Sequence, residues 1–153
     1  MYLTSEIISG RSAALETKGE LEILIVDDDK LVRFMHRNFL EKNSIKNKVE
    51  SFENGKLAWE YVAEMGAVGT SFLVLLDLDM PVMNGWGFLD RLEKYGQDLN
   101  VAVVVISSSL GEKEIRKTIS YSHVIEYESK PLELDRIRSI IKDQRVQGLK
   151  KEM

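Results

Sequence analysis

The chain has 153 residues, of which 44% are hydrophobic and 30% are charged, and its formal net charge is -4. This length fits one domain, and this composition is that of a globular protein rather than a disordered or membrane-spanning chain. The absence of cysteine excludes disulfides and cysteine-ligated zinc. Because the sequence has neither a targeting leader nor an apolar run of about 18 residues, we expect a cytoplasmic protein without a membrane anchor. The negative charge also argues against nucleic acid as a direct partner.

Three short apolar runs, each followed at once by polar residues, predict buried parallel strands. They span residues 21–26, 71–76 and 101–106, and they stop at Asp27, Asp77 and Ser107. Two weaker runs predict further strands at residues 46–52 and 124–128. Lys48 and Glu50 place the first of these two at an edge of the sheet, where charged side chains discourage pairing with another chain.

Between these runs, apolar side chains recur every three or four residues, which predicts helices that each present one stripe to a sheet. The pattern is clear near residues 31–39, 57–65, 86–95 and 132–143, and it is weak at 112–119. Alternating strands and helices predict an α/β domain with a parallel sheet covered on both faces. We expect this domain to span residues 21–144, after an extension of unknown structure (1–20) and before a short basic tail (145–153).

In sheets of this kind the functional crevice lies beyond the carboxyl ends of the strands. The polar residues expected there are Asp27, Asp28, Asp29, Asp77, Asp79, Ser107 and Lys130. Carboxylates that converge repel one another unless a hard cation lies among them, and oxygen ligands suit Mg²⁺ or Mn²⁺. The alternative interpretation is that Asp27 to Asp29 only cap the next helix, whose dipole favours acidic residues at its start.

A carboxylate, a metal, a hydroxyl and a lysine at separate strand ends are the groups that phosphoryl transfer to an aspartate requires. Asp77 would be the nucleophile, and the metal would neutralise charge on the transferred group. Lys130 would donate to the phosphoryl oxygens, and Ser107 would hydrogen-bond the product.

Four segments carry a resemblance to a known family. They are Ile23–Asp29, Leu75–Gly85, Val105–Ser108 and Tyr127–Pro131. In order and spacing they resemble the four sequence blocks of the receiver (CheY-like) domain of bacterial two-component response regulators. The resemblance implies a flavodoxin-like, doubly wound, five-stranded parallel sheet of order 2-1-3-4-5, flanked by five helices.

The resemblance also implies a role for each site residue. Asp77 becomes the phosphoacceptor, and Lys130 becomes the lysine that binds the phosphoryl group. The implied metal ligands are Asp27, Asp28, Asp77 and the backbone carbonyl of Asp79. Ser107 and Tyr127 take the places of the hydroxyl and the aromatic residue that switch together on phosphorylation.

A receiver domain is a signalling phosphoacceptor rather than an enzyme, apart from self-catalysed phosphotransfer and dephosphorylation. The resemblance implies a sensor histidine kinase or a phosphotransfer protein as donor. Because no output domain follows residue 144, we expect the signal to pass by contact with a downstream protein. We expect a monomer, or a weak dimer that depends on phosphorylation.

Some residues depart from the family pattern. Asp79 adds a carboxylate where many relatives have a neutral side chain, and Tyr121-Ser-His123 replaces small residues before the fifth strand. We expect Asp29 to cap the first helix. His36, His123, Trp59 and Trp86 are interpreted as structural residues.

Two other functions remain as alternatives. Asp77-Leu-Asp79 resembles the nucleophile motif of haloacid-dehalogenase-type phosphatases, although no acidic pair follows downstream as that family requires. A degenerate receiver that acts only as a docking module is the other alternative, against which the complete set of Asp28, Asp77, Ser107 and Lys130 argues.

Overall fold

The computed structural model describes residues 20–108 and 111–151, without the side chains of residues 150 and 151. Five parallel strands form one sheet in the order β2-β1-β3-β4-β5, which confirms the predicted topology. The strands are β1 (Leu21–Val26), β2 (Val49–Phe52), β3 (Ser71–Leu76), β4 (Val101–Ser107) and β5 (Val124–Ser129). The described helices are α2 (Lys30–Lys42), α3 (Gly55–Gly66), α4 (Gly85–Tyr95), α5 (Glu112–Ile119), α6 (Leu134–Lys142) and α7 (Gln144–Lys151). Apart from residue 20, the predicted extension lies outside the described residues.

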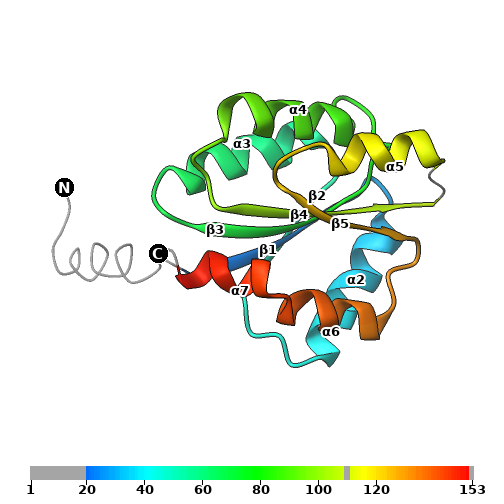
Figure 1. The fold of residues 1–153 in the computed structure, drawn as a ribbon. Helices are drawn as coiled ribbons and strands as arrows, with labels where there is room; N and C mark the ends of the chain where they lie inside the picture. The colour runs from blue at the N-terminus through cyan, green and yellow to red at the C-terminus, as the bar shows by residue number, and fades with distance from the viewer. Residues whose placement is uncertain (1–19, 109–110, 152–153) are drawn as a thin grey trace, which may run out of the picture.

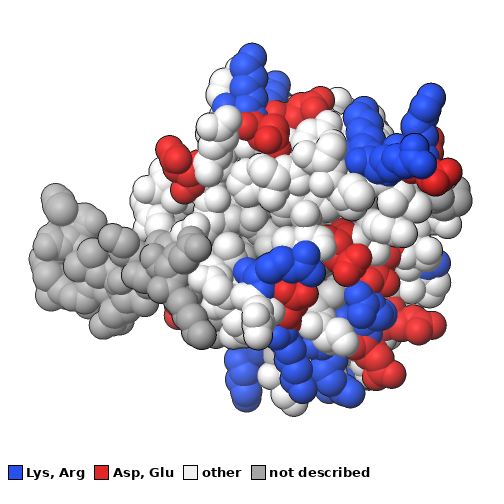
Figure 2. Space-filling view, viewed as in Figure 1, with Lys and Arg blue, Asp and Glu red and all other residues white. Residues whose placement is uncertain are grey.

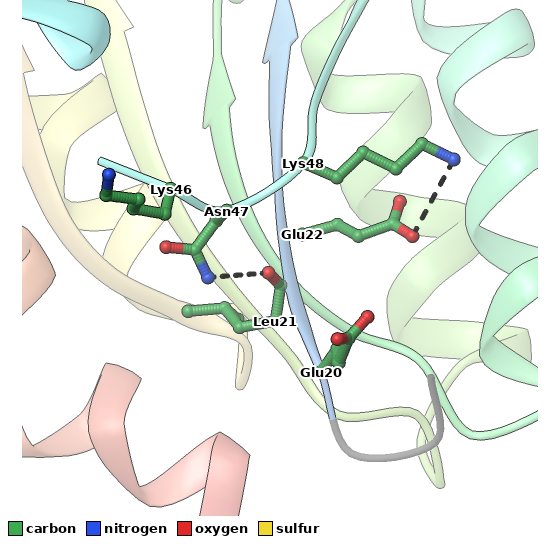
Figure 3. Close-up of a pocket in the computed structure, with 6 residues that line it drawn as sticks. All are labelled: Glu20, Leu21, Glu22, Lys46, Asn47 and Lys48. Carbon is green, nitrogen blue, oxygen red and sulfur yellow. Dashed lines mark hydrogen bonds and ion pairs between the residues drawn. The ribbon is translucent and has the colours of Figure 1, made fainter. Parts of the chain in front are cut away.

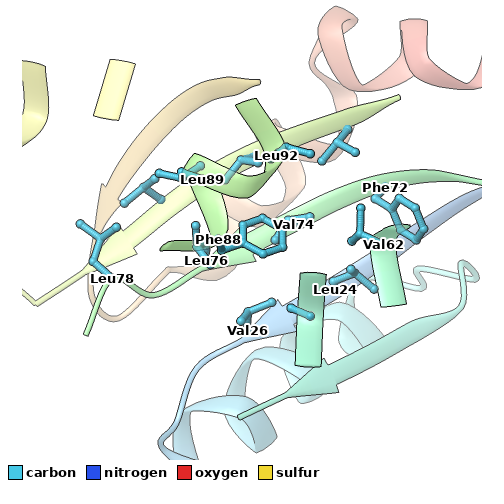
Figure 4. Close-up of a cluster of buried hydrophobic side chains, with 14 residues drawn as sticks. Leu24, Val26, Val62, Phe72, Val74, Leu76, Leu78, Phe88, Leu89 and Leu92 are labelled. Carbon is cyan, nitrogen blue, oxygen red and sulfur yellow. The ribbon is translucent and has the colours of Figure 1, made fainter. Parts of the chain in front are cut away.

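Helices cover both faces of the sheet, with α3, α4 and α5 on one side and α2, α6 and α7 on the other (Figure 1). Side chains alternate along each strand, so that Leu24 and Val26 face the α3 and α4 side (Figure 4). Ile23 and Ile25 face the opposite side, where they pack with residues of α2 and α6. The two hydrophobic clusters hold the sheet between them and fix the positions of the strand ends.

All residues of β1, β3 and β4 are buried, which explains why these strands could be predicted from unbroken apolar runs. The edge strand β2 is only partly buried and is shorter than predicted, because it begins at Val49 rather than Lys46. Residues 46–48 instead lie beside the start of β1, where the Asn47 side-chain amide donates a hydrogen bond to the carbonyl of Leu21 at 2.8 Å.

Asparagine or aspartate side chains begin three of the helices. Asp29, Asn54 and Asn84 each accept a hydrogen bond from a backbone N–H in the first turn of α2, α3 and α4 respectively. These caps satisfy N–H groups that have no partner within the helix. They therefore set where each helix begins, and two of these helices, α2 and α4, follow loops that carry site residues.

Helix α7 stands where we expected a basic tail. Asp143 ends α6 and accepts hydrogen bonds from the backbone and guanidinium of Arg145, and α7 begins at Gln144. Val146 is buried in the cluster beneath α6, and the Ser71 hydroxyl donates to the carbonyl of Leu149 at 3.3 Å. The chain therefore stays packed on the domain beyond residue 144.

Among the residues that the structure describes, no helix has both the length and the apolar character needed to cross a bilayer.

Candidate functional site

The acidic residues gather at the carboxyl edge of the sheet. Asp27 follows β1 and Asp77 follows β3, and because these strands are neighbours in register the two residues lie side by side. The Asp77 N–H donates to the carbonyl of Val26 at 2.9 Å, which ties the two strand ends together. Both carboxylates are buried, whereas Asp28 is exposed.

Lys130 joins the two buried carboxylates. Its Nζ lies 2.8 Å from Oδ2 of Asp27 and 3.3 Å from Oδ1 of Asp77. The backbone N–H of Lys130 donates to the carbonyl of Ser107 at 2.9 Å, so the end of β4 holds the lysine in place. The peptide bond between Lys130 and Pro131 is cis. One ammonium group thus forms ion pairs with two carboxylates.

This arrangement sets the acidity of the site. Burial, followed by the charge of Asp27, raises the pKa of Asp77 to about 6, although Lys130 and the backbone N–H of Asp79 act in the opposite direction. Burial alone would lower the pKa of Lys130, but hydrogen bonds and charges from the two aspartates raise it. At neutral pH Asp77 is therefore mostly ionised, and Lys130 is charged.

Asp27, Asp28 and Asp77 can hold a metal ion together. Each offers a carboxylate oxygen, and these oxygens all lie within 4.8 Å of one another. Three carboxylates facing a single ammonium leave negative charge uncompensated, and an all-oxygen donor set fits Mg²⁺ or Mn²⁺. The residues present therefore fit the metal that the sequence predicts.

The two remaining aspartates have different surroundings. Asp29 accepts from the N–H groups of Leu31 and Val32 and caps α2, as we expected. The exposed Asp79 contributes its backbone N–H to Asp77. Its backbone carbonyl as a metal ligand stays a prediction.

Ser107 and Tyr127 lie on neighbouring strands. Ser107 is buried as the last residue of β4, directly across from Ser129 of β5. Tyr127 pairs with Val105 and is 37% exposed, so its ring lies partly at the surface. The structure places both near the carboxyl edge, and their joint switching stays a prediction.

Two residues of α2 lie beside the site, a position that was not predicted for either of them. The Arg33 guanidinium donates to the backbone carbonyl of Asp27 at 2.7 Å, which holds the acidic loop against α2. His36 is buried, and among the described residues its Nε2 has no hydrogen-bond partner. Burial lowers the pKa of His36, which favours the neutral form of the ring. A structural role for His36 agrees with this environment.

A cavity of about 470 Å³ lies at the opposite, amino-terminal edge of the sheet. Figure 3 shows its lining by Glu20, Leu21 and Glu22 from the start of β1 and by Lys46, Asn47 and Lys48 before β2. None of these residues belongs to the acidic cluster. The chemistry of the carboxyl edge is therefore separate from this cavity.

Comparisons with known proteins agree with this geometry. Residues 23–142 match the model of the response regulator receiver domain family. Two-component response regulator 24 of Arabidopsis thaliana is 32% identical over 124 residues, which cover 81% of this chain and 84% of that relative.

Solved structures show the same fold. A two-component response regulator from Cytophaga hutchinsonii superposes with a TM-score of 0.75 at 24% identity, covering 84% of this chain and 98% of that one. A chain of the co-crystal structure of the Saccharomyces cerevisiae histidine phosphotransfer protein Ypd1 with the receiver domain of Ssk1 has a TM-score of 0.68 at 23% identity, covering 80% of this chain and 87% of that one. With the match over residues 23–142, the chain belongs to the response regulator receiver domain family.

Proposed function

We propose that this receiver domain accepts a phosphoryl group on Asp77 in a magnesium-dependent reaction and transmits the signal by contact with another protein. The observation that carries the proposal is the cluster of Asp27, Asp28 and Asp77 carboxylates within 4.8 Å, with Lys130 between two of them. Phosphorylation on aspartate is typical of the family, and membership of this family replaces the dehalogenase-type phosphatase alternative.

The reaction needs few parts. A carboxylate oxygen of Asp77 attacks the phosphorus of a donor phosphohistidine, the O–P bond forms as the P–N bond breaks, and the bonding pair stays on the histidine nitrogen, which takes a proton from solvent. Lys130 lies 3.3 Å from Asp77 and can follow the charge onto the phosphoryl oxygens. A Mg²⁺ ion held by Asp27, Asp28, Asp77 and the Asp79 carbonyl would neutralise further charge. Attack by water on the same phosphorus would return Asp77 and release phosphate.

Exposed apolar side chains beside the crevice fit a protein donor. Leu31 and Phe34, in the first turns of α2, are 70% and 66% exposed, and Val82 in the loop between β3 and α4 is 79% exposed. Apolar side chains that surround a polar reaction centre are typical of protein docking sites. The co-crystal structure of Ypd1 with a receiver domain supports a histidine phosphotransfer protein, or the related domain of a sensor kinase, as the partner.

The surface of α5, β5 and α6 is the proposed output face. It exposes Ile119 and Tyr127, and Arg136 pairs there with Glu128. Figure 2 shows basic and acidic side chains interspersed over this part of the molecule. A change at Ser107 that moves Tyr127 would alter the surface that a partner meets.

Intact-mass spectrometry tests the proposal. With phosphoramidate and Mg²⁺, we expect one phosphoryl group that hydroxylamine removes, because an acyl phosphate is a reactive mixed anhydride. EDTA should suppress it, and Asp77→Asn should abolish it. A folded wild-type protein that takes up no phosphoryl group would instead indicate a degenerate receiver that only docks.

Phosphotransfer from a protein donor tests the docking site separately. We expect Phe34→Ser to slow transfer from a purified phosphohistidine-carrying phosphotransfer domain by about tenfold. The reason is the loss of one aromatic contact that the complex with the donor would bury. Labelling by phosphoramidate, which needs no docking, should stay unchanged. Equal transfer rates from the protein donor in both proteins would place the docking site elsewhere.

A further inference from the structure

Asp27 is held in place through both its backbone and its side chain. Its N–H donates to the carbonyl of Phe52 at 3.0 Å, and its Oδ1 accepts from the N–H of Asp29 at 2.8 Å. Its Oδ2 lies 2.8 Å from Nζ of Lys130. The remaining polar group, the backbone carbonyl, accepts from Nη1 of Arg33 at 2.7 Å. Every polar group of Asp27 therefore has a partner.

The neighbouring ligand Asp28 is held differently. Its side chain is exposed, and among the described residues its carboxylate takes part in no hydrogen bond or ion pair. One of its carboxylate oxygens nevertheless lies within 4.8 Å of oxygens of Asp27 and Asp77. Since no such contact within the described residues holds the side chain toward the cluster, its direction depends on the backbone that carries it.

The hydrogen bond from Arg33 acts on that backbone. The carbonyl of Asp27 belongs to the peptide unit that joins Asp27 to Asp28, and a peptide unit is a rigid plane. A guanidinium bound to the oxygen restricts the rotation of this plane, and with it the direction of the Cα–Cβ bond of Asp28. Arg33 lies near the start of α2, which the Asp29 side chain caps, so the donor belongs to a rigid element.

We propose that Arg33 is a positioning residue for the metal site, because it holds the Asp27–Asp28 peptide so that the Asp28 carboxylate faces the cluster. The inference rests on the proposed function, since it concerns the divalent ion that phosphoryl transfer would use. Arg33 acts through Asp28, because its hydrogen bond is to a backbone carbonyl rather than to a carboxylate.

Charge and positioning make opposite predictions for this arginine. A guanidinium beside the acidic cluster repels a divalent cation, so electrostatics alone predicts that removal of Arg33 tightens metal binding. Positioning predicts weaker binding, because groups that orient a metal ligand typically contribute about tenfold or more to the metal affinity. The direction of the change therefore separates the two effects.

Titration with Mn²⁺ measures that direction, because the EPR signal of the free ion falls as the ion binds. Arg33→Met keeps a long, helix-forming side chain without charge or donor, and we expect it to weaken Mn²⁺ binding about tenfold. Arg37→Met is the matched control and should bind Mn²⁺ as wild type does. Arg37 lies one turn further along α2, is half-buried like Arg33, and donates to the carbonyl of Val49 instead.

A double-mutant cycle tests the route through Asp28. In an Asp28→Ala background, Arg33→Met should weaken Mn²⁺ binding no further, because the carboxylate that Arg33 positions is already absent. Equal or tighter Mn²⁺ binding by Arg33→Met than by wild type would overturn the inference. An equal loss of affinity in both backgrounds would also overturn it, because Arg33 would then not act through Asp28.

Amide exchange without metal separates this inference from the proposed function. In EDTA we expect the Asp29 amide to exchange about fivefold faster in Arg33→Met than in wild type or Arg37→Met, as measured by NMR spectroscopy. The reason is that its hydrogen bond to Asp27 depends on a loop that is no longer held. Equal rates in wild type and Arg33→Met would overturn the inference. A wild-type protein that binds no Mn²⁺ would contradict the proposed metal site, and the exchange rates would still decide whether Arg33 holds the Asp27–Asp28 peptide.

Discussion

Asp77 must be ionised to act as a nucleophile, yet it lies in a buried position beside another carboxylate. Its pKa of about 6 reflects that conflict. At neutral pH the reactive form predominates, but the folded state holds it at a cost in free energy. The free-energy cost of ionised Asp77 changes when a metal ion binds the carboxylates, or when a phosphoryl group binds Lys130. The site therefore responds to its ligands.

The first prediction concerns stability without metal. In the unfolded chain Asp77 ionises near its ordinary pKa of 3.8, and in the folded chain near 6, so its unfavourable effect is absent below about pH 4 and grows as the pH rises through 6. In EDTA we expect Asp77→Asn to be more stable than wild type by up to about 3 kcal/mol at about pH 7.5. Urea denaturation measures this, and a gain that does not shrink toward about pH 4 would contradict the raised pKa.

The second prediction concerns the metal. Asp28→Ala should weaken Mg²⁺ binding at least about tenfold, since it removes a charged ligand from a site with few protein ligands. Its stability in EDTA should not fall, because the cluster then carries less negative charge. The control is Asp29→Ser, which removes a neighbouring charge but keeps a side chain that can cap α2. If calorimetric titration gave equal affinities for wild type and Asp28→Ala, Asp28 would not be a ligand.

At the scale of elements, β1 carries a buried acid in its second position. The Tyr61 hydroxyl of α3 donates to Oε1 of Glu22 at 2.5 Å, and Lys48 Nζ lies 4.0 Å from Oε2. Burial and the bond to Glu22 raise the pKa of Tyr61 to about 12, so the hydroxyl stays a donor. Tyr61 also packs against the rings of Phe52 and Phe72.

Removing this donor should destabilise the sheet. We expect Tyr61→Phe to cost about 1–3 kcal/mol, because the Glu22 carboxylate stays buried without its hydroxyl partner. The same change in a Glu22→Gln background should cost less, since no charge is then left unpaired. Urea denaturation of the four proteins gives the coupling, and additive effects would mean that the bond contributes nothing specific.

Helix α7 should contribute to stability even though it lies at the end of the described chain. Val146→Ala removes two buried methyl groups and should cost about 2 kcal/mol. Val68→Ala, at an exposed position, should have little effect. If the two variants unfolded at the same urea concentration, α7 would not be packed on the domain.

The sequence predicted elements best where one local pattern decides them. The buried strands β1, β3 and β4 are apolar throughout, and their boundaries follow from where the polar residues begin. Helix α7 was missed because it is short and basic, with only Val146 and Leu149 as an apolar pair. Its position depends on the break at Asp143 and on space beneath α6, which no local pattern shows.

At the site, too, local patterns predicted some residues, whereas others depend on contacts between distant parts of the chain. Asp27, Asp77 and Lys130 follow strands directly, so the geometry of a parallel sheet brings them together. Arg33 could not be predicted, because its contact is to a backbone carbonyl that any residue could supply. Tyr121 and Ser122 were noted in the sequence only as departures from the family pattern, because their hydrogen-bond partners Asp90 and Glu93 lie about 30 residues earlier in the chain.

At the scale of the whole molecule, the central question is how the buried site affects the surface. Ser107 and Tyr127 lie on adjacent strands, so a hydroxyl drawn toward a phosphoryl group can leave space for the ring. A tenfold shift between two states requires about 1.4 kcal/mol, which is comparable to one net hydrogen bond.

We therefore expect Ser107→Ala to separate phosphorylation from signalling. The variant should still accept a phosphoryl group on Asp77. The amide chemical-shift changes that accompany phosphorylation should become smaller around Tyr127 and the first half of α5, as measured by NMR spectroscopy. Shifts of equal size and direction in both proteins would mean that the signal reaches the surface by another route.

The most direct test of the account is to locate the phosphoryl group chemically. Borohydride reduces an aspartyl phosphate to homoserine, so the modified position can be read by peptide mass spectrometry after reaction with phosphoramidate and Mg²⁺. We predict homoserine at position 77, and none at that position when EDTA or Asp77→Asn is used. Homoserine at Asp27, Asp28 or Asp79 instead, or phosphorylation that persists in Asp77→Asn, would contradict the assignment of Asp77 as the phosphoacceptor.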